Sequence, residues 1–249
     1  MRTPRTFRSF SWKDTNLRIS SDQFELITAT IMAQRRELEA YIRQQPAFQS
    51  ALSPIPLLEQ APAIARRMGR AAELTGLGPM ASVAGTLAQL GVEAAMAAGC
   101  GEAIVENGGD IALFSREAIT IGIYPGSVLA GGLAFALRPE ELPLAICSSS
   151  STMGHSLSLG DCDLATVTAR EAALADSVAT LVANSISAAK DLESVLNRAG
   201  AIAGVQGILA VKSGKIGIWG SLPRLVRSSD PALVAKITRD RRSDFSGQP

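Results

Sequence analysis

The sequence has few of the residues that mark several common classes of protein. Its three cysteines, Cys100, Cys147 and Cys162, are an odd number and form no CxxC pair, so neither a disulfide framework nor a structural zinc site is expected. The single histidine is His155, so any imidazole acid–base step falls to that residue. Aromatic residues make up only 4% of the chain, and no run of lysine and arginine is interleaved with them. Nucleic-acid binding is therefore not expected.

No segment has the pattern of a secretory signal or of a membrane span. The N-terminus has basic residues but no apolar core behind them. Residues 118–137 contain no charge and are long enough to cross a bilayer, but Pro125 and Gly126 interrupt them and Ile119 and Ile121 alternate with other residues. This pattern predicts two short strands joined by a turn. We therefore expect a cytoplasmic protein with reduced thiols and no membrane partner.

Charge is unevenly distributed, although the net charge is only +1. Residues 71–163 contain ten acidic and two basic residues, so this segment has a charge of −8 and the rest of the chain +9. An acidic segment suits a metal or a cationic ligand. A phosphate ligand there would need backbone N–H groups, a metal, or basic side chains from the two ends of the chain.

Hydrophobic residues make up 47% of the 249 residues, enough for a full core. Apolar periodicity predicts helices over 22–44, 63–75, 79–98, 171–187 and 190–199. It predicts strands over 7–11, 16–19, 102–106, 110–114, 118–123, 132–137, 143–147, 164–169, 203–211 and 215–219. Because strands occur in runs, the expected fold class is α+β, a single domain with a mostly antiparallel sheet packed with helices.

Within that domain we expect three regions. Residues 1–62 contain the N-terminal strands, the long helix and a proline-rich connector, 63–230 form the core, and 231–249 are a polar tail. The long N-terminal helix can pack on its own sheet or on a partner chain, so a homodimer stays an open alternative.

Residues 107–110 are the first motif that suggests a ligand site. Asn107-Gly108-Gly109-Asp110 lies between two predicted strands. A two-residue hairpin turn explains it as structure alone. As a site, the two glycines let a ligand approach the backbone closely, and Asp110 supplies a carboxylate for a hydroxyl, an amine or a metal. The two interpretations are compatible, and all four residues are ligand-binding candidates.

A second motif lies in the helix predicted over 171–187. Asp176 and Thr180 are four residues apart, so they share a helical face that differs from the apolar stripe of Leu174, Val178 and Leu181. A carboxylate and a hydroxyl at this spacing can take two positions on Mg²⁺, which prefers oxygen ligands. The structural alternative is a polar stripe that faces solvent.

A serine-rich segment near the histidine is the third candidate. Residues 148–151 are all serine, and His155 follows them as the candidate acid–base group. The candidate ligand-binding hydroxyls are those of Ser149, Ser150 and Ser156. Cys147 precedes the segment at a predicted strand end and is a candidate reactive thiolate, although most lone cysteines are buried and inert. The structural alternative is a surface loop with an incidental histidine.

Taken together, these motifs resemble the ApbE superfamily, whose best-known members are FAD-dependent flavin transferases, over roughly residues 76–184. Residues 107–110 look like the family's Gly-Gly-Asp segment, and residues 175–180 look like its Ala-Asp-Ala-Leu-Ala-Thr segment. In the transferases that aspartate and threonine help to hold a divalent metal beside the flavin pyrophosphate. The resemblance therefore implies an ApbE-like fold, Asp176 and Thr180 as metal ligands, Mg²⁺ as the cation, and FAD or another nucleotide as the ligand.

Two departures from the transferase pattern argue against flavin transfer. The transferases have Gly-Gly-x-x-Lys-Gly before the first motif, whereas residues 78–85 read GPMASVAG and contain no lysine. Their His-x-x-Asp-Pro segment is replaced by GHSLSLG at residues 154–160. Residues 78–81, 105–110 and 154–158 more closely resemble an uncharacterised ApbE-like branch found in anaerobic bacteria and archaea. That branch has been linked to homocysteine synthesis from aspartate semialdehyde and sulfide, which indicates a pathway and not a reaction.

Three functions compete, in this order. The first is an enzyme or enzyme subunit that binds a phosphate-bearing small molecule through a divalent metal. The second is an accessory protein that handles sulfur through Cys147 and works with a partner from a sulfur pathway. The third is a ligand-binding or interaction module without catalysis, which the missing lysine allows. We expect residues 107–110, the His155 loop and Asp176 to converge on one cleft.

Overall fold

Two antiparallel sheets organise the fold in the computed structural model, which describes residues 5–13, 15–124, 132–151 and 160–228. The larger sheet has eight strands in the order β1-β2-β3-β4-β7-β8-β9-β10, and the smaller has three in the order β11-β6-β5. The strands of the larger sheet are β1 (Arg8–Trp12), β2 (Thr15–Ser21), β3 (Glu102–Asn107), β4 (Asp110–Ser115), β7 (Leu144–Ser149), β8 (Leu164–Ala169), β9 (Val205–Lys212) and β10 (Lys215–Gly220). Those of the smaller sheet are β5 (Ile119–Ile123), β6 (Gly132–Leu137) and β11 (Arg224–Ser228). Every strand pairing described in the two sheets is antiparallel, which confirms the predicted α+β class.

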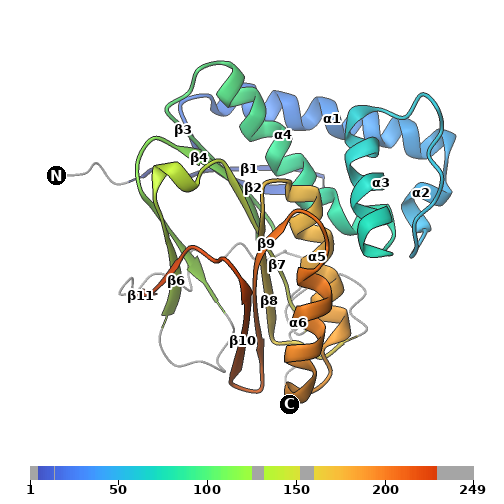
Figure 1. The fold of residues 1–249 in the computed structure, drawn as a ribbon. Coiled ribbons are helices and arrows are strands. Elements are labelled where there is room, and N and C mark those ends of the chain that lie inside the picture. The colour runs from blue at the N-terminus through green and yellow to red at the C-terminus, as the bar shows by residue number, and fades with distance from the viewer. Residues whose placement is uncertain (1–4, 14, 125–131, 152–159, 229–249) are drawn as a thin grey trace, which may run out of the picture.

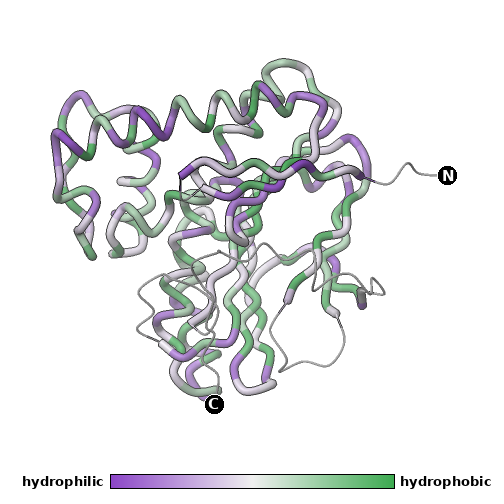
Figure 2. The backbone as a smooth tube through the Cα atoms, turned by 180° about the vertical axis from the view of Figure 1, so that it is seen from behind, coloured by the Kyte–Doolittle hydropathy of each residue, from purple (hydrophilic) through white to green (hydrophobic). Residues whose placement is uncertain are grey.

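The helices cover one face of the larger sheet (Figure 1). They are α1 (Phe24–Gln44), α2 (Ala47–Ser50), α3 (Ala63–Thr75), α4 (Val83–Ala97), α5 (Ala172–Ser185) and α6 (Leu192–Gly200), with short 3₁₀ turns at Pro79–Ser82, Pro139–Glu141 and Ala189–Asp191. Helix α1 is amphipathic, and its hydrophilic and hydrophobic stretches alternate along the tube of Figure 2. It packs on its own sheet, as one of the two predicted arrangements requires.

Three apolar clusters fill the interior. The first lies between α1, α3, α4 and strands β2 to β4, and the second between α5, α6 and strands β7 to β9. The third lies on the opposite face of the larger sheet, where β5 and β6 cover it with Ile121, Phe135 and Leu137. Alternation of side chains along a strand puts Ile104 in the third cluster and Val105 in the first.

The uncharged segment over 118–137 forms strands, as predicted. Strands β5 and β6 pair in antiparallel register from Ile119↔Leu137 to Ile123↔Leu133, and residues 125–131 between them lie outside the described residues. Among the described residues no helix is both long and apolar enough to span a bilayer.

Sequence periodicity missed two elements. Helix α2 has only four residues, too few to show a helical period. Strand β11 pairs with β6 next to the polar C-terminal region, and its sequence RLVRS has only two apolar residues. The predicted polar tail over 231–249 lies outside the described residues.

Candidate functional site

The turn at residues 107–110 is a two-residue hairpin between β3 and β4, as its sequence predicts. Asn107 pairs with Asp110, and the two central glycines have φ values of +65° and +105°. Such positive values suit the primed turns that match the twist of a hairpin, and glycine adopts them without strain. The turn places the Asn107 and Asp110 side chains on the helix-covered face of the sheet, where both are buried. The structural and the ligand-binding interpretations therefore both remain available.

The first turn of α4 lies against this hairpin and against α5. The Asn107 amide donates from Nδ2 to the Ala84 carbonyl at 3.1 Å. The Gly85 N–H donates to Oδ2 of Asp176 at 2.9 Å. Ser82, at the N-cap position of α4, makes no side-chain cap hydrogen bond. Asp176 therefore caps α4 from another helix, where a carboxylate is favoured by the positive end of the helix dipole.

Asp176 is buried, so the alternative of a solvent-facing polar stripe on α5 is wrong for this residue. Only 8% of its surface is exposed. The neighbouring Ser177 is also buried, and its hydroxyl lies 2.8 Å from that of Thr75 on α3. Thr180, one turn further along α5, is half-buried. Helix α5 thus has a polar line that faces the protein interior and reaches its surface at Thr180.

Cys147 lies between the two aspartates. Strand β4 pairs with β7 through Ile111↔Ile146, and one step further in this register puts Asp110 opposite Cys147. The Cys147 thiol is fully buried and lies 3.7 Å from the Ala172 carbonyl at the start of α5. The Asp110 and Cys147 side chains are hydrogen-bonded. The hairpin, β7, α4 and α5 therefore meet at one buried polar cluster: Asp110, Cys147 and Asp176.

Gly85 makes this meeting sterically possible. A Cβ atom at that position would lie 2.8 Å from the Ala172 carbonyl oxygen, 3.0 Å from the Cβ of Asp176 and 3.2 Å from the sulfur of Cys147. Real Cβ atoms almost never lie closer than 3.0 Å to such neighbours; the first contact is shorter than this limit and the second is at it. Glycine at residue 85 thus allows the backbone of α4 to reach the cluster.

The two carboxyl groups have strongly perturbed acidities. Burial raises the pKa of Asp176 from 3.8 to about 7, although hydrogen bonds from the Gly85 and Ala84 backbone oppose the rise. Burial also raises the pKa of Asp110 well above its usual value, and the nearby charge of Asp176 raises it further. We infer that Asp176 ionises first, because the backbone N–H groups stabilise its charge, and that this charge then holds Asp110 protonated.

One oxygen of this cluster has no hydrogen-bond partner in the described part of the chain. It is Oδ1 of Asp110, which is buried. None of the ion pairs recorded among the described residues involves Asp110 or Asp176. A buried polar atom without a partner costs free energy, which a bound cation or a donating group would recover.

The surroundings of Cys147 disfavour a reactive thiolate. Burial raises the pKa of the thiol well above 9.0, and the charges of Asp110 and Asp176 raise it further. A nucleophilic cysteine needs the opposite environment, with nearby positive charge and access to solvent. In this arrangement Cys147 is a buried thiol that donates to the Ala172 carbonyl.

The serine-rich segment begins on the same face and continues beyond the cluster. Ser149 ends β7, Ser150 follows it, and both are half-buried. Ser151 accepts a hydrogen bond from the Cys162 N–H at 3.2 Å, its own N–H donates to the Cys162 carbonyl at 3.0 Å, and its hydroxyl donates to the Ala183 carbonyl on α5. His155 and Ser156 lie outside the described residues.

The structure thus unites two of the three predicted segments. The hairpin and Asp176 share one buried cluster, whereas the convergence of these residues with His155 on one cleft stays a prediction. Ser151, which precedes the segment that contains His155, donates to the Ala183 carbonyl, seven residues or about 10 Å along α5 from Asp176. Sequence reasoning did not assign Gly85 to the site, although this glycine ends the stretch compared with the transferases' Gly-Gly-x-x-Lys-Gly segment.

Comparisons with known proteins agree with this architecture. The family model described as AbpE bacteria matches residues 3–209. The UPF0280 protein of Methanocella arvoryzae is 37% identical over 234 residues, covering 92% of this chain and 96% of that protein. The UPF0280 protein of Methanospirillum hungatei is 40% identical over 226 residues, covering 89% and 90%.

Two solved structures share the fold at low sequence identity. The flavin transferase ApbE from Vibrio cholerae matches with a TM-score of 0.56 and 14% identity, covering 91% of this chain and 97% of that one. The apo form of the Pseudomonas stutzeri flavinyl transferase ApbE matches with a TM-score of 0.57 and 10% identity, covering 86% and 94%. At these identities the likeness establishes the ApbE fold.

Proposed function

This chain belongs to the family described as AbpE bacteria, and on that premise we propose that it binds a phosphate-bearing, flavin- or nucleotide-like ligand through a divalent cation at Asp110 and Asp176. The observation that carries the proposal is the buried carboxylate pair. Two acids lie together, and among the described residues neither has a basic partner and one oxygen of Asp110 has no hydrogen-bond partner. Such a pair costs stability unless a proton or a cation occupies it.

The donor chemistry fits a hard cation. Asp110 and Asp176 contribute carboxylate oxygens. The Thr180 hydroxyl lies one turn of α5 beyond Asp176, where this helix reaches the surface. Mg²⁺ prefers such oxygens and usually keeps waters that phosphate oxygens can replace. A bound cation would supply positive charge to the ligand phosphates, which no lysine in residues 78–85 can supply.

The chain's own groups would position the ligand beside that cation. Gly108 and Gly109 have no side chains, so a ligand can approach the backbone of the turn closely. The hydroxyls of Ser149 and Ser150 and the ring of His155 are the candidates to contact the rest of the ligand. One oxygen of Asp176 holds the start of α4, so ligand binding at the cluster would also fix the position of that helix.

The resemblance to the anaerobic ApbE-like branch adds a pathway to the proposal, namely sulfide assimilation to homocysteine. A strain that lacks the protein should then need homocysteine when sulfide is the sulfur source. The alternative of a sulfur-handling protein requires Cys147 to become accessible. Mass spectrometry of the natively purified protein tests this alternative, because a persulfide on Cys147 would add the mass of one sulfur atom. A protein without any bound nucleotide, flavin or persulfide would favour the non-catalytic module.

The proposed cation site is tested directly with Mn²⁺, because the electron paramagnetic resonance signal of the free ion decreases when the ion binds to a protein. The proposal predicts Mn²⁺ binding that Mg²⁺ competes away, loss of binding in Asp176→Asn and Asp110→Asn, and weaker binding in Thr180→Val. Asp176→Asn keeps an oxygen that can accept from Gly85, so it separates the charge from the capping role. Asp22→Asn is the matched control, because Asp22 is exposed, and this variant should bind Mn²⁺ as the parent does. Equal binding by Asp176→Asn and the parent would refute the proposal.

Thermal unfolding gives a second readout. Mg²⁺ should raise the melting temperature of the parent, and a nucleotide together with Mg²⁺ should raise it further by mass action. Asp176→Ala should abolish the response to Mg²⁺. A mutant that responds as the parent does would show that Asp176 is not a ligand.

A further inference from the structure

The C-terminal edge of the larger sheet is an open strand with apolar side chains. Strand β10 is the last of the eight strands, and its outer edge pairs with no other described strand. Ile216 and Ile218 are 45% and 55% exposed. They lie opposite Val211 and Leu209 of β9, two residues of the core between the sheets. The apolar face of that core therefore continues to the sheet edge, where no described strand covers it.

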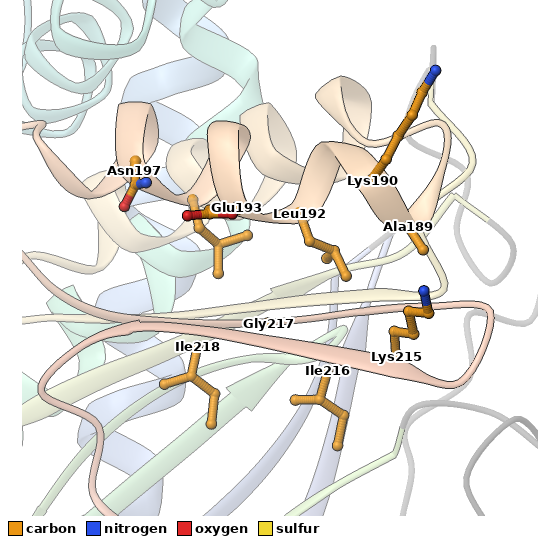
Figure 3. A pocket seen from close by; sticks show the side chains of 10 residues that line it. Ala189, Lys190, Leu192, Glu193, Asn197, Lys215, Ile216, Gly217 and Ile218 are labelled. Carbon is orange, nitrogen blue, oxygen red and sulfur yellow. The ribbon is translucent and has the colours of Figure 1, made fainter.

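The other face of β10 borders a groove beneath α6. The groove has a volume of about 380 Å³ and includes Leu192, Leu196, Glu193 and Asn197 of the helix. Figure 3 shows Leu192 directed toward β10, whereas Ile216 and Ile218 project from the side of the strand that faces away from α6. Unprotected edges of this kind readily pair with another strand.

We propose that β10 pairs with β10 of a second copy of this chain, antiparallel, about a two-fold axis at Gly217. A two-fold axis perpendicular to the sheet keeps each face on the same side, so paired residues must both project to one face. In this register Ile216 lies opposite Ile218 of the second copy, and Ile218 opposite its Ile216. The isoleucines of both copies then form one apolar cluster that continues the core between the sheets.

The backbone of β10 is arranged for this register. The β9–β10 hairpin has a two-residue turn, Ser213-Gly214, with φ values of +50° and +75°, and Lys212 pairs with Lys215. The pair that closes such a turn exchanges both hydrogen bonds, so alternate residues from Lys215 bond to β9. The N–H and C=O groups of Ile216 and Ile218 therefore point outward, and the proposed register pairs these residues with each other.

Helix α6 completes the interface on the opposite face. Leu192 and Leu196 lie over Gly217, and the Trp219 ring lies against Gly200, so α6 runs in the same direction as β10 and spans the axis. Because α6 packs on both β9 and β10, the α6 helices of two copies would lie about 8–10 Å apart, the spacing of packed helices. Glu193 would then face Asn197 of the second copy, and Asn197 its Glu193.

Cysteine cross-linking tests the register. The native cysteines are all buried, so they provide no background. Gly217→Cys should form a disulfide-linked dimer on mild oxidation, because paired Cα atoms at this position would be about 4.5 Å apart. Ile216→Cys alone should not, because its two copies would be about 8 Å apart. A mixture of Ile216→Cys and Ile218→Cys should cross-link again. A dimer in which Gly217→Cys fails to cross-link would overturn the proposal.

Sedimentation velocity on the full chain tests the energetics. The parent should be a dimer, and Ile218→Lys should weaken the dimer about a hundredfold or more, since each dimer loses two buried isoleucines. Leu52→Lys is the matched control, because Leu52 is 72% exposed and lies far from β10 along the chain. It should dimerise as the parent does. A parent that stays monomeric at its highest soluble concentration would contradict the inference, as would an undiminished dimer in Ile218→Lys.

Discussion

Replacing Asp176 by asparagine should remove a pH dependence from the stability of the metal-free protein. The folded-state pKa of Asp176 is about 7, against 3.8 for an ordinary aspartate. Between these two values the folded protein holds a proton that the unfolded chain has released. The free energy of unfolding therefore falls as the pH rises from about 4 through about 7, and the loss is complete above the folded-state pKa.

The magnitude follows from the two pKa values. Each tenfold change in acidity corresponds to about 1.4 kcal/mol, so a rise from 3.8 to about 7 corresponds to a loss of about 4 kcal/mol across that range. Only 8% of the Asp176 surface is exposed, so solvent screens the effect little. Asp110 adds a further loss at higher pH, because its own pKa is also raised.

The assay is urea unfolding in a chelating buffer at a series of pH values. Asp176→Asn keeps the shape and an acceptor oxygen for Gly85, so its unfolding free energy should vary far less with pH and should exceed that of the parent at pH 8. Asp22→Asn makes the same chemical change at an exposed position and should follow the parent. Parallel pH profiles for Asp176→Asn and the parent would refute the assignment of a raised pKa to Asp176.

Three further predictions follow from the same cluster. Mg²⁺ should stabilise the parent more strongly as the pH rises through about 7, because the cation must displace a proton from Asp176; a response to Mg²⁺ that is flat with pH would contradict this. Gly85→Ala should lower the free energy of unfolding by about 1–3 kcal/mol through overpacking, whereas Gly101→Ala, where no atom lies within 4 Å of the added Cβ, should be nearly neutral; chemical denaturation compares the two. The protein should not transfer FMN from FAD to an acceptor that has a flavinylation motif, because Ser82 and Val83 occupy the region of the transferase lysine and a lost charged contact to phosphate costs about 1.5–3 kcal/mol. A fluorescent acceptor band that depends on Asp176 would restore the transferase interpretation.

Local patterns in the sequence were sufficient for most of the secondary structure. The sequence predicts a helix over 63–75, and α3 is observed over Ala63–Thr75, where Gly76 ends it in the left-handed conformation. The hairpin at residues 107–110 was equally accessible, since two adjacent glycines favour a primed turn. Such features depend on neighbouring residues alone, which is why the sequence reveals them.

The order of the strands and the electrostatics of the site were not accessible in this way. The placement of β7 beside β4 brings Cys147 next to Asp110, although 36 residues separate them in the chain. The periodicity of α5 separated Asp176 from the apolar stripe, yet the helix is buried on both sides and Asp176 faces the interior. Only the packing of α4 against α5 shows that this carboxylate caps another helix. Without the resemblance to a known family, Asp176 would have had no stronger claim than any polar helix residue.

The capping role and the proposed metal-binding role of Asp176 make opposite demands on the residue. A cap alone would be served by asparagine, which accepts the same N–H bond without the cost of burying a charge beside Asp110. A carboxylate that destabilises the metal-free protein at neutral pH is therefore in excess of what the fold requires. Residues that reduce stability in this way are typical of binding and catalytic sites, where the cost is recovered when the ligand is present. An Asp176→Asn protein that is more stable than the parent without cation, and less stable than the parent with it, would show both halves of this argument in one pair of unfolding curves.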